Sequence, residues 1–412
     1  MDLKECIVGL AVFSLIVLDT ELDYYMDMKD IVTFINEGLE NIRLSDTDKK
    51  RLLMLDKEYG DIVDTFRHDR NDKDVLNMDE EFDKFMAARN RGMKYFPHIK
   101  LQPHKFDTDG LLGRVERLIA EFQRFDCFLS KYYLELLEPM VYKIKHVLEP
   151  EKYHSWYVTY QAQKPSYENY IAAERMLLEN PYEKIDDSDR NIDGKTAAKM
   201  IQDHIDKLGY GWKVKLNDNM IPRMNVDTNK TMNVKTSAKF SKTDIEGLKA
   251  HEVEGHIGRR YYGLKTGLYL FLYGLLWRNT LDEGLAIWNS LNKVSKVKPN
   301  VKFNIALKTI ICYYLNDKDF CELFDMCREL DSNIPDKTLF STLVRFKREI
   351  QDCSLIGGNG DDQSYFCGYQ IVKDMTDAER DDILKYNIGP GQIHELPKIK
   401  RFLEVNKFEP LI

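Results

Sequence analysis

The chain has 412 residues, enough for two or three domains or for one large domain with an extension. Its 60 basic and 68 acidic side chains give a net charge of -8, and 43% of its residues are hydrophobic, as in a globular protein with a substantial core. A nucleic-acid-binding protein usually has a basic surface, so we expect no nucleic-acid partner. The charge is uneven, because residues 1–90 carry 22 acidic and 12 basic side chains.

The cysteines and the apolar segments bear on the cellular location. The seven cysteines include no CxxC pair, so the sequence suggests neither a cysteine zinc site nor a disulfide framework, and a reduced, cytoplasmic protein is the simplest interpretation. The one long apolar run, Cys6–Leu18, is too short to span a bilayer, so no stable membrane insertion is expected. Acidic residues before the run and the lack of a cleavage site favour a buried first element. A signal or membrane anchor at 6–18 is the alternative.

Residues 1–93 are predicted to form an acidic helical segment. Three stretches repeat apolar residues at spacings of three and four, with polar residues between: Met28–Arg43, Asp46–Arg67 and Asp79–Arg91. Tyr95–Pro103 then has two prolines with alternating residues between them, which suits an extended connector. We therefore predict a boundary there, with a second domain over residues 94–412.

Residues 94–412 are predicted to be mostly helical with one small sheet. Helical patterns occupy Thr108–Leu148 and Gly194–Leu208, and the C-terminal third is helical around a glycine-rich loop at Gly357–Gly360. From Trp212 the period becomes two, over WKVKL, MIPRMNV and TMNVKTSA, with DTNK as a turn. This pattern indicates a small antiparallel sheet or hairpin. The expected fold class is α+β, mostly helical.

The helix predicted after this sheet carries the residues with the clearest chemistry. Ser241 is placed to cap it, and its sequence contains His251, Glu252 and His256 as HExxxH. A second predicted helix offers Glu283 within LDEGLAIW. Two neutral imidazoles and a carboxylate are the protein ligands of a catalytic zinc, and a glutamate beside the first histidine suits a general base.

The spacing of the two histidines requires a distorted helix. Residues five apart on a regular helix point about 140° away from each other, whereas residues four apart differ by about 40°. Both histidines can therefore share one ion only if the helix is widened, as by a π-bulge, and Gly255 would ease that distortion. HExxxH alone is a weak motif. The order of hairpin, HExxxH helix and second helix favours a gluzincin-like metallopeptidase core over two unrelated histidines.

The surrounding segments extend this pattern along the chain. HEVEGHIGRRYY, LYLFLYGL and LDEGLAIWN follow one another, and VRFKRE (Val344–Glu349) and DDQSYFCG (Asp361–Gly368) come later. Together with YFPHIKL upstream, they resemble the microtubule-associated tyrosine carboxypeptidase family and its bacterial relatives with a QEGLA motif. The resemblance covers about 94–412. It implies a zinc-dependent carboxypeptidase, and the best-known activity of the family is removal of the C-terminal tyrosine of a tubulin tail.

The motif and the resemblance together suggest a role for each candidate residue. His251, His256 and Glu283 would bind one Zn²⁺, and Glu252 would take a proton from water. Tyr365 is a candidate for stabilising the developing oxyanion, with packing in the core as the alternative.

A carboxypeptidase must also hold the terminal carboxylate of its substrate, for which an arginine is the natural partner. By family position the candidates are Arg259, Lys347 and Arg348, each with a solvated surface cation as the alternative. The chain departs from the family pattern after Arg259, where the usual asparagine is either replaced by Tyr262 or displaced, and at Glu349, where a glycine is usual. The reaction class is therefore more firmly implied than the substrate.

The expected partner is a peptide or protein tail. Residues 195–242 contain 10 basic and 4 acidic side chains, which would attract an acidic, tubulin-like tail if this segment lines the cleft. An exposed lysine-rich hairpin is the alternative. Two further functions remain open: a zinc peptidase with a different peptide substrate, and a catalytically silent scaffold that binds a partner.

Overall fold

The computed structural model describes residues 42–71, 75–102, 107–149, 152–154, 164–184, 187–218, 223–226, 230–275 and 280–412. The first predicted element, Cys6–Leu18, lies outside the described residues. The helix predicted at Met28–Arg43 also lies outside them, except for its last two positions.

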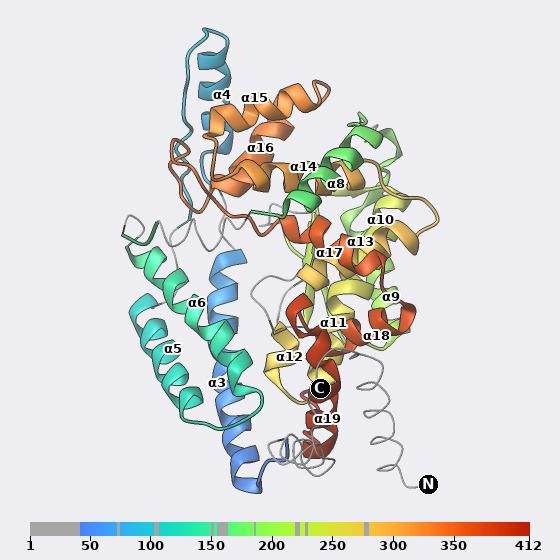
Figure 1. The fold of residues 1–412 in the computed structure, drawn as a ribbon. Coiled ribbons are helices and arrows are strands. Elements are labelled where there is room, and N and C mark those ends of the chain that lie inside the picture. The colour runs from blue at the N-terminus through green and yellow to red at the C-terminus, as the bar shows by residue number, and fades with distance from the viewer. Residues whose placement is uncertain are drawn as a thin grey trace, which may run out of the picture.

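The described residues are mostly helical, as predicted, and Figure 1 shows their arrangement. The α-helices are α3 (Asp46–Asn71), α4 (Met78–Arg89), α5 (Thr108–Gln123), α6 (Ser130–Leu148), α8 (Tyr167–Glu179), α9 (Gly194–Leu208), α10 (Lys242–Leu248), α11 (Gly258–Lys265), α12 (Tyr269–Tyr273), α13 (Thr280–Asn292), α14 (Val301–Tyr314), α15 (Phe320–Leu330), α16 (Asp336–Lys347), α17 (Gln363–Lys373), α18 (Asp377–Tyr386) and α19 (Leu396–Asn406). Other helical turns are η1 (Asp187–Asp189), η2 (Lys249–Ile257) and η3 (Pro390–Glu395). The strands are β1 (Ile192–Asp193), β2 (Lys213–Leu216), β3 (Met224–Val226), β4 (Thr231–Val234) and β5 (Lys239–Phe240).

The small sheet precedes the HExxxH residues, as predicted, but its topology is mixed. Its order is β2-β4-β3, with β4 antiparallel to β3 and parallel to β2. The prediction of a purely antiparallel sheet is therefore wrong for one of the two pairings. β4 is the central strand, with β3, which precedes it in the chain, on one side and β2 on the other. A separate antiparallel pair joins β1 to β5.

The long helical pattern predicted over Thr108–Leu148 is divided by a turn. Phe125, Cys127 and Leu129 are buried between α5 and α6. The Ser130 hydroxyl donates to the Phe125 carbonyl oxygen at 2.8 Å, which ties the turn to the start of α6. The amphipathic pattern was right for both helices, but periodicity does not show a turn whose residues are themselves apolar.

Buried apolar side chains form two clusters that meet at α13 and α17. One cluster is built by α3, α5, α6, α9, α11, α12 and α19 with the sheet, and the other by α4, α8, α14, α15 and α16. On α13, Leu285 belongs to the first cluster and Ile287 to the second. On α17, Val372 belongs to the first and Phe366 to the second. The two apolar clusters therefore meet along these two helices.

α13 and α17 cross with their backbones in contact. A Cβ atom added to Gly284 would lie 2.3 Å from the carbonyl carbon of Gly368, and one added to Gly368 would lie 1.9 Å from the Thr280 carbonyl oxygen. On the other side of α13, a Cβ at Gly255 of η2 would lie 2.9 Å from the Ala286 Cβ. Only glycine allows such approaches, so η2, α13 and α17 are held as one tightly packed unit.

α3 is anchored to the rest of the molecule by a buried carboxylate. Asp56 accepts hydrogen bonds from the Tyr133 hydroxyl at 2.6 Å and from the backbone amides of Tyr269 and Leu270 at 2.7 and 2.9 Å. Burial raises the pKa of Asp56 to about 6, against the effect of these donors. The described part of the acidic N-terminal segment therefore shares a core with later helices, and the boundary near residue 94 stays a prediction.

The location in the cell is addressed by two observations on the described residues. No helix among them is both long and apolar enough to cross a membrane. The six cysteines that the structure describes are all free. The cytoplasmic location stays a prediction.

The α13–α17 crossing leads to the first prediction. Gly284→Ala should lower the free energy of unfolding by about 1–3 kcal/mol, because the methyl group has no space without moving a backbone. Gly247→Ala in α10 is the matched control: nothing lies within 4 Å of the added atom, so this variant should be neutral or up to about 1 kcal/mol more stable. Urea unfolding measures both, and equal midpoints for the two variants would contradict the crossing.

Candidate metal centre

The HExxxH residues lie within one continuous helical path made by α10, η2 and α11. Ser241 caps its start, as predicted: its hydroxyl accepts from the Asp244 amide at 3.0 Å, and the Asp244 carboxylate accepts from the Ser241 amide at 3.1 Å. The cap fixes where the path begins. It therefore also fixes which turns face α13.

η2 is π-helical over Lys249–Ile257 and contains His251, Glu252 and His256. The i→i+5 hydrogen bonds of a π-helix widen each turn, so residues five apart come onto nearly the same face. The widening that the histidine spacing requires is thus present. Gly255 lies within it, but its clearest structural role is the close approach to Ala286.

The two histidines converge on Glu283 of α13. Its Oε2 atom is 3.7 Å from the His251 Nε2 atom and 3.4 Å from the His256 Nε2 atom. The three candidate ligand atoms all lie within 4.8 Å of one another. Ligand atoms about 2.0–2.1 Å from a tetrahedral zinc would be about 3.3–3.4 Å apart, so the arrangement fits that ion with little movement.

Burial supports the same interpretation. The side chains of His251, His256 and Glu283 are only 18%, 11% and 18% exposed. Glu283 Oε2 is buried and has no hydrogen-bond partner among the described residues. A buried carboxylate oxygen without a donor is costly, and a cation placed between the three ligand atoms would remove that cost.

The δ nitrogen of each histidine has its own partner. His256 Nδ1 is 3.0 Å from Asp282 Oδ2, and His251 Nδ1 is 3.3 Å from Ser290 Oγ. Ser290 donates its own proton to the Ala286 carbonyl at 2.9 Å, so its oxygen can accept from His251. With a proton on each Nδ1 atom, the two Nε2 atoms would be free to bind a metal ion, as metal-binding histidines require.

Charge around the histidines favours a cation. Burial lowers the pKa of His251. Burial acts in the same direction on His256, but the charges of Asp282 and Glu283 outweigh it and hold the pKa of His256 well above its usual value. These two carboxylates create the negative field in which a divalent cation can replace a proton.

Arg259 lies behind the histidines. Its side chain is buried, Nη2 donates to the Ile388 carbonyl at 3.0 Å, and Nε is 3.8 Å from Asp282 Oδ1. The sequence suggested Arg259 as a substrate-binding cation. In the structure it is buried next to Asp282, the partner of His256, and its role in substrate binding stays a prediction.

Glu252 and Tyr365 flank the histidine pair. Glu252 is half-buried on η2, and its charge partly opposes the lowering of the His251 pKa by burial. The Tyr365 and His251 rings are nearly parallel, with centroids 6.4 Å apart. The charge of Glu283, followed by burial, holds the pKa of Tyr365 well above its usual value. Its hydroxyl therefore keeps its proton and can donate.

The other two cations suggested by the sequence lie at the end of α16. Lys347 is fully buried, its Nζ donates to the Leu355 carbonyl at 2.7 Å, and burial lowers its pKa to about 8. Arg348 is half-buried immediately after it. The role of both cations in substrate binding stays a prediction.

The sequence interpretation missed four polar residues around this centre. Asp282 lies in the segment LDEGLAIW beside Glu283, but no role was assigned to it from the sequence. Arg345 and Asp362 lie inside the two segments that carried the resemblance, VRFKRE and DDQSYFCG, but other residues of those segments were chosen. Lys308 had a detectable signal, since it is a lysine among the buried apolar residues of α14.

The contact between His256 and Asp282 generates the second prediction. Asp282→Asn should weaken zinc binding by about 10- to 100-fold, because the amide carries no charge to stabilise the His256 N–H. Asp381→Asn is the matched control on α18, where the carboxylate is exposed and pairs with Lys385, and it should leave the affinity unchanged. Competition against a zinc chelator measures both. An unaltered affinity in Asp282→Asn would show that Asp282 does not orient His256.

All residues of this site lie within the part of the chain that matches a known family. The model of the family described as microtubule-associated tyrosine carboxypeptidase matches residues 89–399, about three quarters of the chain. The matched range includes η2, α13, α16 and α17. No curated protein matches the chain.

Proposed function

The chain belongs to the microtubule-associated tyrosine carboxypeptidase family, and from this membership we propose that it is a zinc-dependent carboxypeptidase that releases the last residue of a protein tail. The family implies a peptidase of the carboxypeptidase type that acts on tubulin. The observation that carries the zinc part of the proposal is the convergence of two Nε2 atoms and one carboxylate oxygen, with both Nδ1 atoms separately bonded.

The proposed mechanism divides the work among residues of three elements. His251 and His256 from η2 and Glu283 from α13 would hold the ion, as in a gluzincin-like core. Zinc bound there supplies a Lewis acid that polarises the scissile carbonyl. Glu252 takes a proton from the attacking water and passes it to the leaving amine. Tyr365, which keeps its proton, donates to the developing oxyanion.

The substrate proposed is a C-terminal tail, and a tubulin-like tail ending in tyrosine is the leading candidate. The family membership supports this choice, and so does the basic composition of residues 195–242, which suits an acidic tail. Arg259 and Lys347 are the least accessible of the cations suggested by sequence, with 1% and 0% of their surface exposed. A substrate carboxylate would reach them only by displacing the groups that cover them.

Two other functions remain as alternatives. A zinc peptidase with a different peptide substrate would use the same residues, so only substrate tests separate it. A silent scaffold is less favoured, because the chain has both histidines, Glu283 and Glu252.

The third prediction tests the reaction and the base. Glu252→Gln should keep zinc and lower turnover by about 10²- to 10⁴-fold, the range expected for loss of a general base. Glu254→Gln is the matched control on the same helix, where the carboxylate faces His204 and Lys293 instead, and it should retain most of the activity. Turnover that survives in Glu252→Gln would mean that the base is misassigned.

The measurement is mass spectrometry of matched tail peptides ending in Tyr, Phe or Ala, incubated with wild type and both variants. We expect release of the last residue only, fastest for tyrosine. Equal release from all three peptides would exclude tyrosine specificity while leaving carboxypeptidase activity in place.

A further inference from the structure

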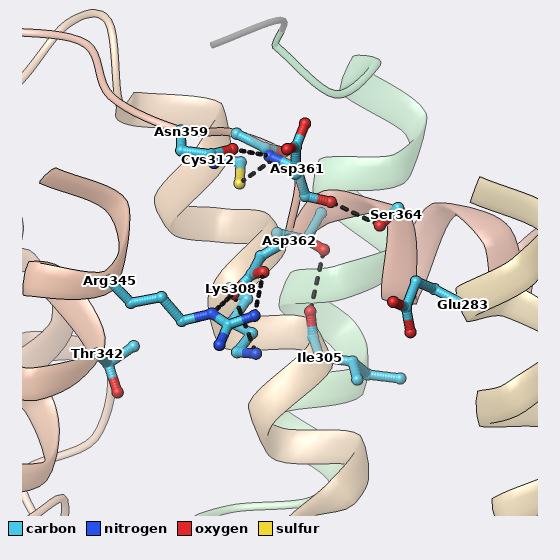
Figure 2. A network of polar contacts seen from close by, with 12 residues as sticks. Glu283, Ile305, Lys308, Cys312, Thr342, Arg345, Asn359, Asp361, Asp362 and Ser364 are labelled. Carbon is cyan, nitrogen blue, oxygen red and sulfur yellow. Dashed lines mark hydrogen bonds and ion pairs between the residues drawn. The ribbon is translucent and has the colours of Figure 1, made fainter. Parts of the chain in front are cut away.

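A second charged cluster, on the same side of the molecule as Glu283, is formed by Lys308 of α14, Arg345 of α16 and Asp362, the N-cap residue of α17 (Figure 2). The Arg345 guanidinium from α16 binds the Asp362 carboxylate twice, with Nε to Oδ2 at 2.6 Å and Nη2 to Oδ1 at 2.8 Å. Lys308 of α14 places its Nζ 3.0 Å from the same Oδ2 atom. Two cations therefore share one carboxylate, which leaves the cluster with one surplus positive charge.

This cluster adjoins the proposed reaction site through Tyr365. The Lys308 Nζ atom lies 4.7 Å from the centroid of the Tyr365 ring, and that ring stacks toward His251. Burial lowers the pKa of Lys308, whereas the charge of Asp362 raises the pKa of Arg345, and the charge of Glu283 acts on both cations as a smaller, raising contribution. The surplus cation is therefore next to the proposed metal site.

The three members differ in access to solvent. The Asp362 and Lys308 side chains are 11% and 22% exposed, whereas Arg345 is 45% exposed. The bonds to Asp362 use Nε and one terminal nitrogen of Arg345, and among the described residues no hydrogen bond is made by Nη1. The edge of the guanidinium that faces Asp362 is thus fixed, and the hydrogens of Nη1 remain for a ligand to accept.

Such an arrangement is a preorganised receptor for a carboxylate. The planar guanidinium can bind one carboxylate with its Nε edge and a second with its outer edge. Because Asp362 already holds the plane in place, little side-chain freedom is lost when a ligand binds. The surplus charge of the cluster matches the single negative charge of a peptide C-terminus.

We propose that Arg345, held by Asp362 and Lys308, binds the C-terminal carboxylate of the peptide substrate. The proposal rests on the proposed carboxypeptidase function, and it names a different cation from those that the sequence suggested. Arg345 is the substrate-binding residue, and Asp362 and Lys308 position it. A free carboxylate should therefore be selected over a neutral amide at this end of the substrate.

The experiment measures binding instead of turnover, in full-length, zinc-loaded Glu252→Gln protein. Two versions of one tail peptide, one with a free C-terminus and one amidated, are titrated by calorimetry. The free acid should bind about 10- to 100-fold more tightly, as expected for a charge-assisted bidentate contact. Adding Arg345→Gln should remove this preference by weakening only the free acid, whereas Arg345→Lys should keep part of it.

The matched control is Arg114→Gln, which removes another partly exposed arginine that pairs with a carboxylate, Glu58. It should leave the preference unchanged. A purely structural role for Arg345 would weaken both peptides equally. That result, or equal binding of acid and amide before Arg345 is changed, would overturn the proposal. Turnover by the wild type reports on the proposed function separately, so failure of one is distinguishable from failure of the other.

Discussion

The close crossing of three helical elements is the constraint on which the site depends. Gly255 admits Ala286 of α13, and Gly284 on the same helix admits the backbone of α17 at Gly368. Because α13 is in contact on both sides, Glu283 is held toward the histidines of η2. Tyr365 of α17 is brought beside the same histidines. Side chains larger than glycine at these crossings would separate the elements that carry the proposed ligands, the proposed base and the proposed donor.

The geometry of the candidate metal centre also depends on the π-helical segment η2. It changes only the width of the helical turn, but this width decides whether two histidines five residues apart can bind one ion. Partners on the neighbouring helix then select the ring orientation, since Asp282 and Ser290 both come from α13. The ligand geometry is therefore a joint product of a local distortion and of helix packing.

Much of the candidate site could be predicted from the local sequence. The rest depends on contacts between residues that are distant in the sequence. The Ser241 cap, the helix with HExxxH and the need for widening follow from residues within a few positions of one another. The pairing of Arg345 with Asp362 and Lys308 does not, because it joins three helices that only tertiary packing brings together. The parallel pairing of β2 with β4 was missed for a similar reason, since strand periodicity carries no information on neighbours.

The central claim is that two imidazole nitrogens and one carboxylate oxygen of this chain form a zinc site. X-ray absorption spectroscopy at the zinc edge of the purified, zinc-loaded protein tests it most directly. We expect the first coordination shell of the zinc to contain nitrogen and oxygen only, at about 2.0–2.1 Å, with the outer-shell scattering of two imidazoles. A sulfur ligand at about 2.3 Å, or a spectrum without imidazole scattering, would contradict it.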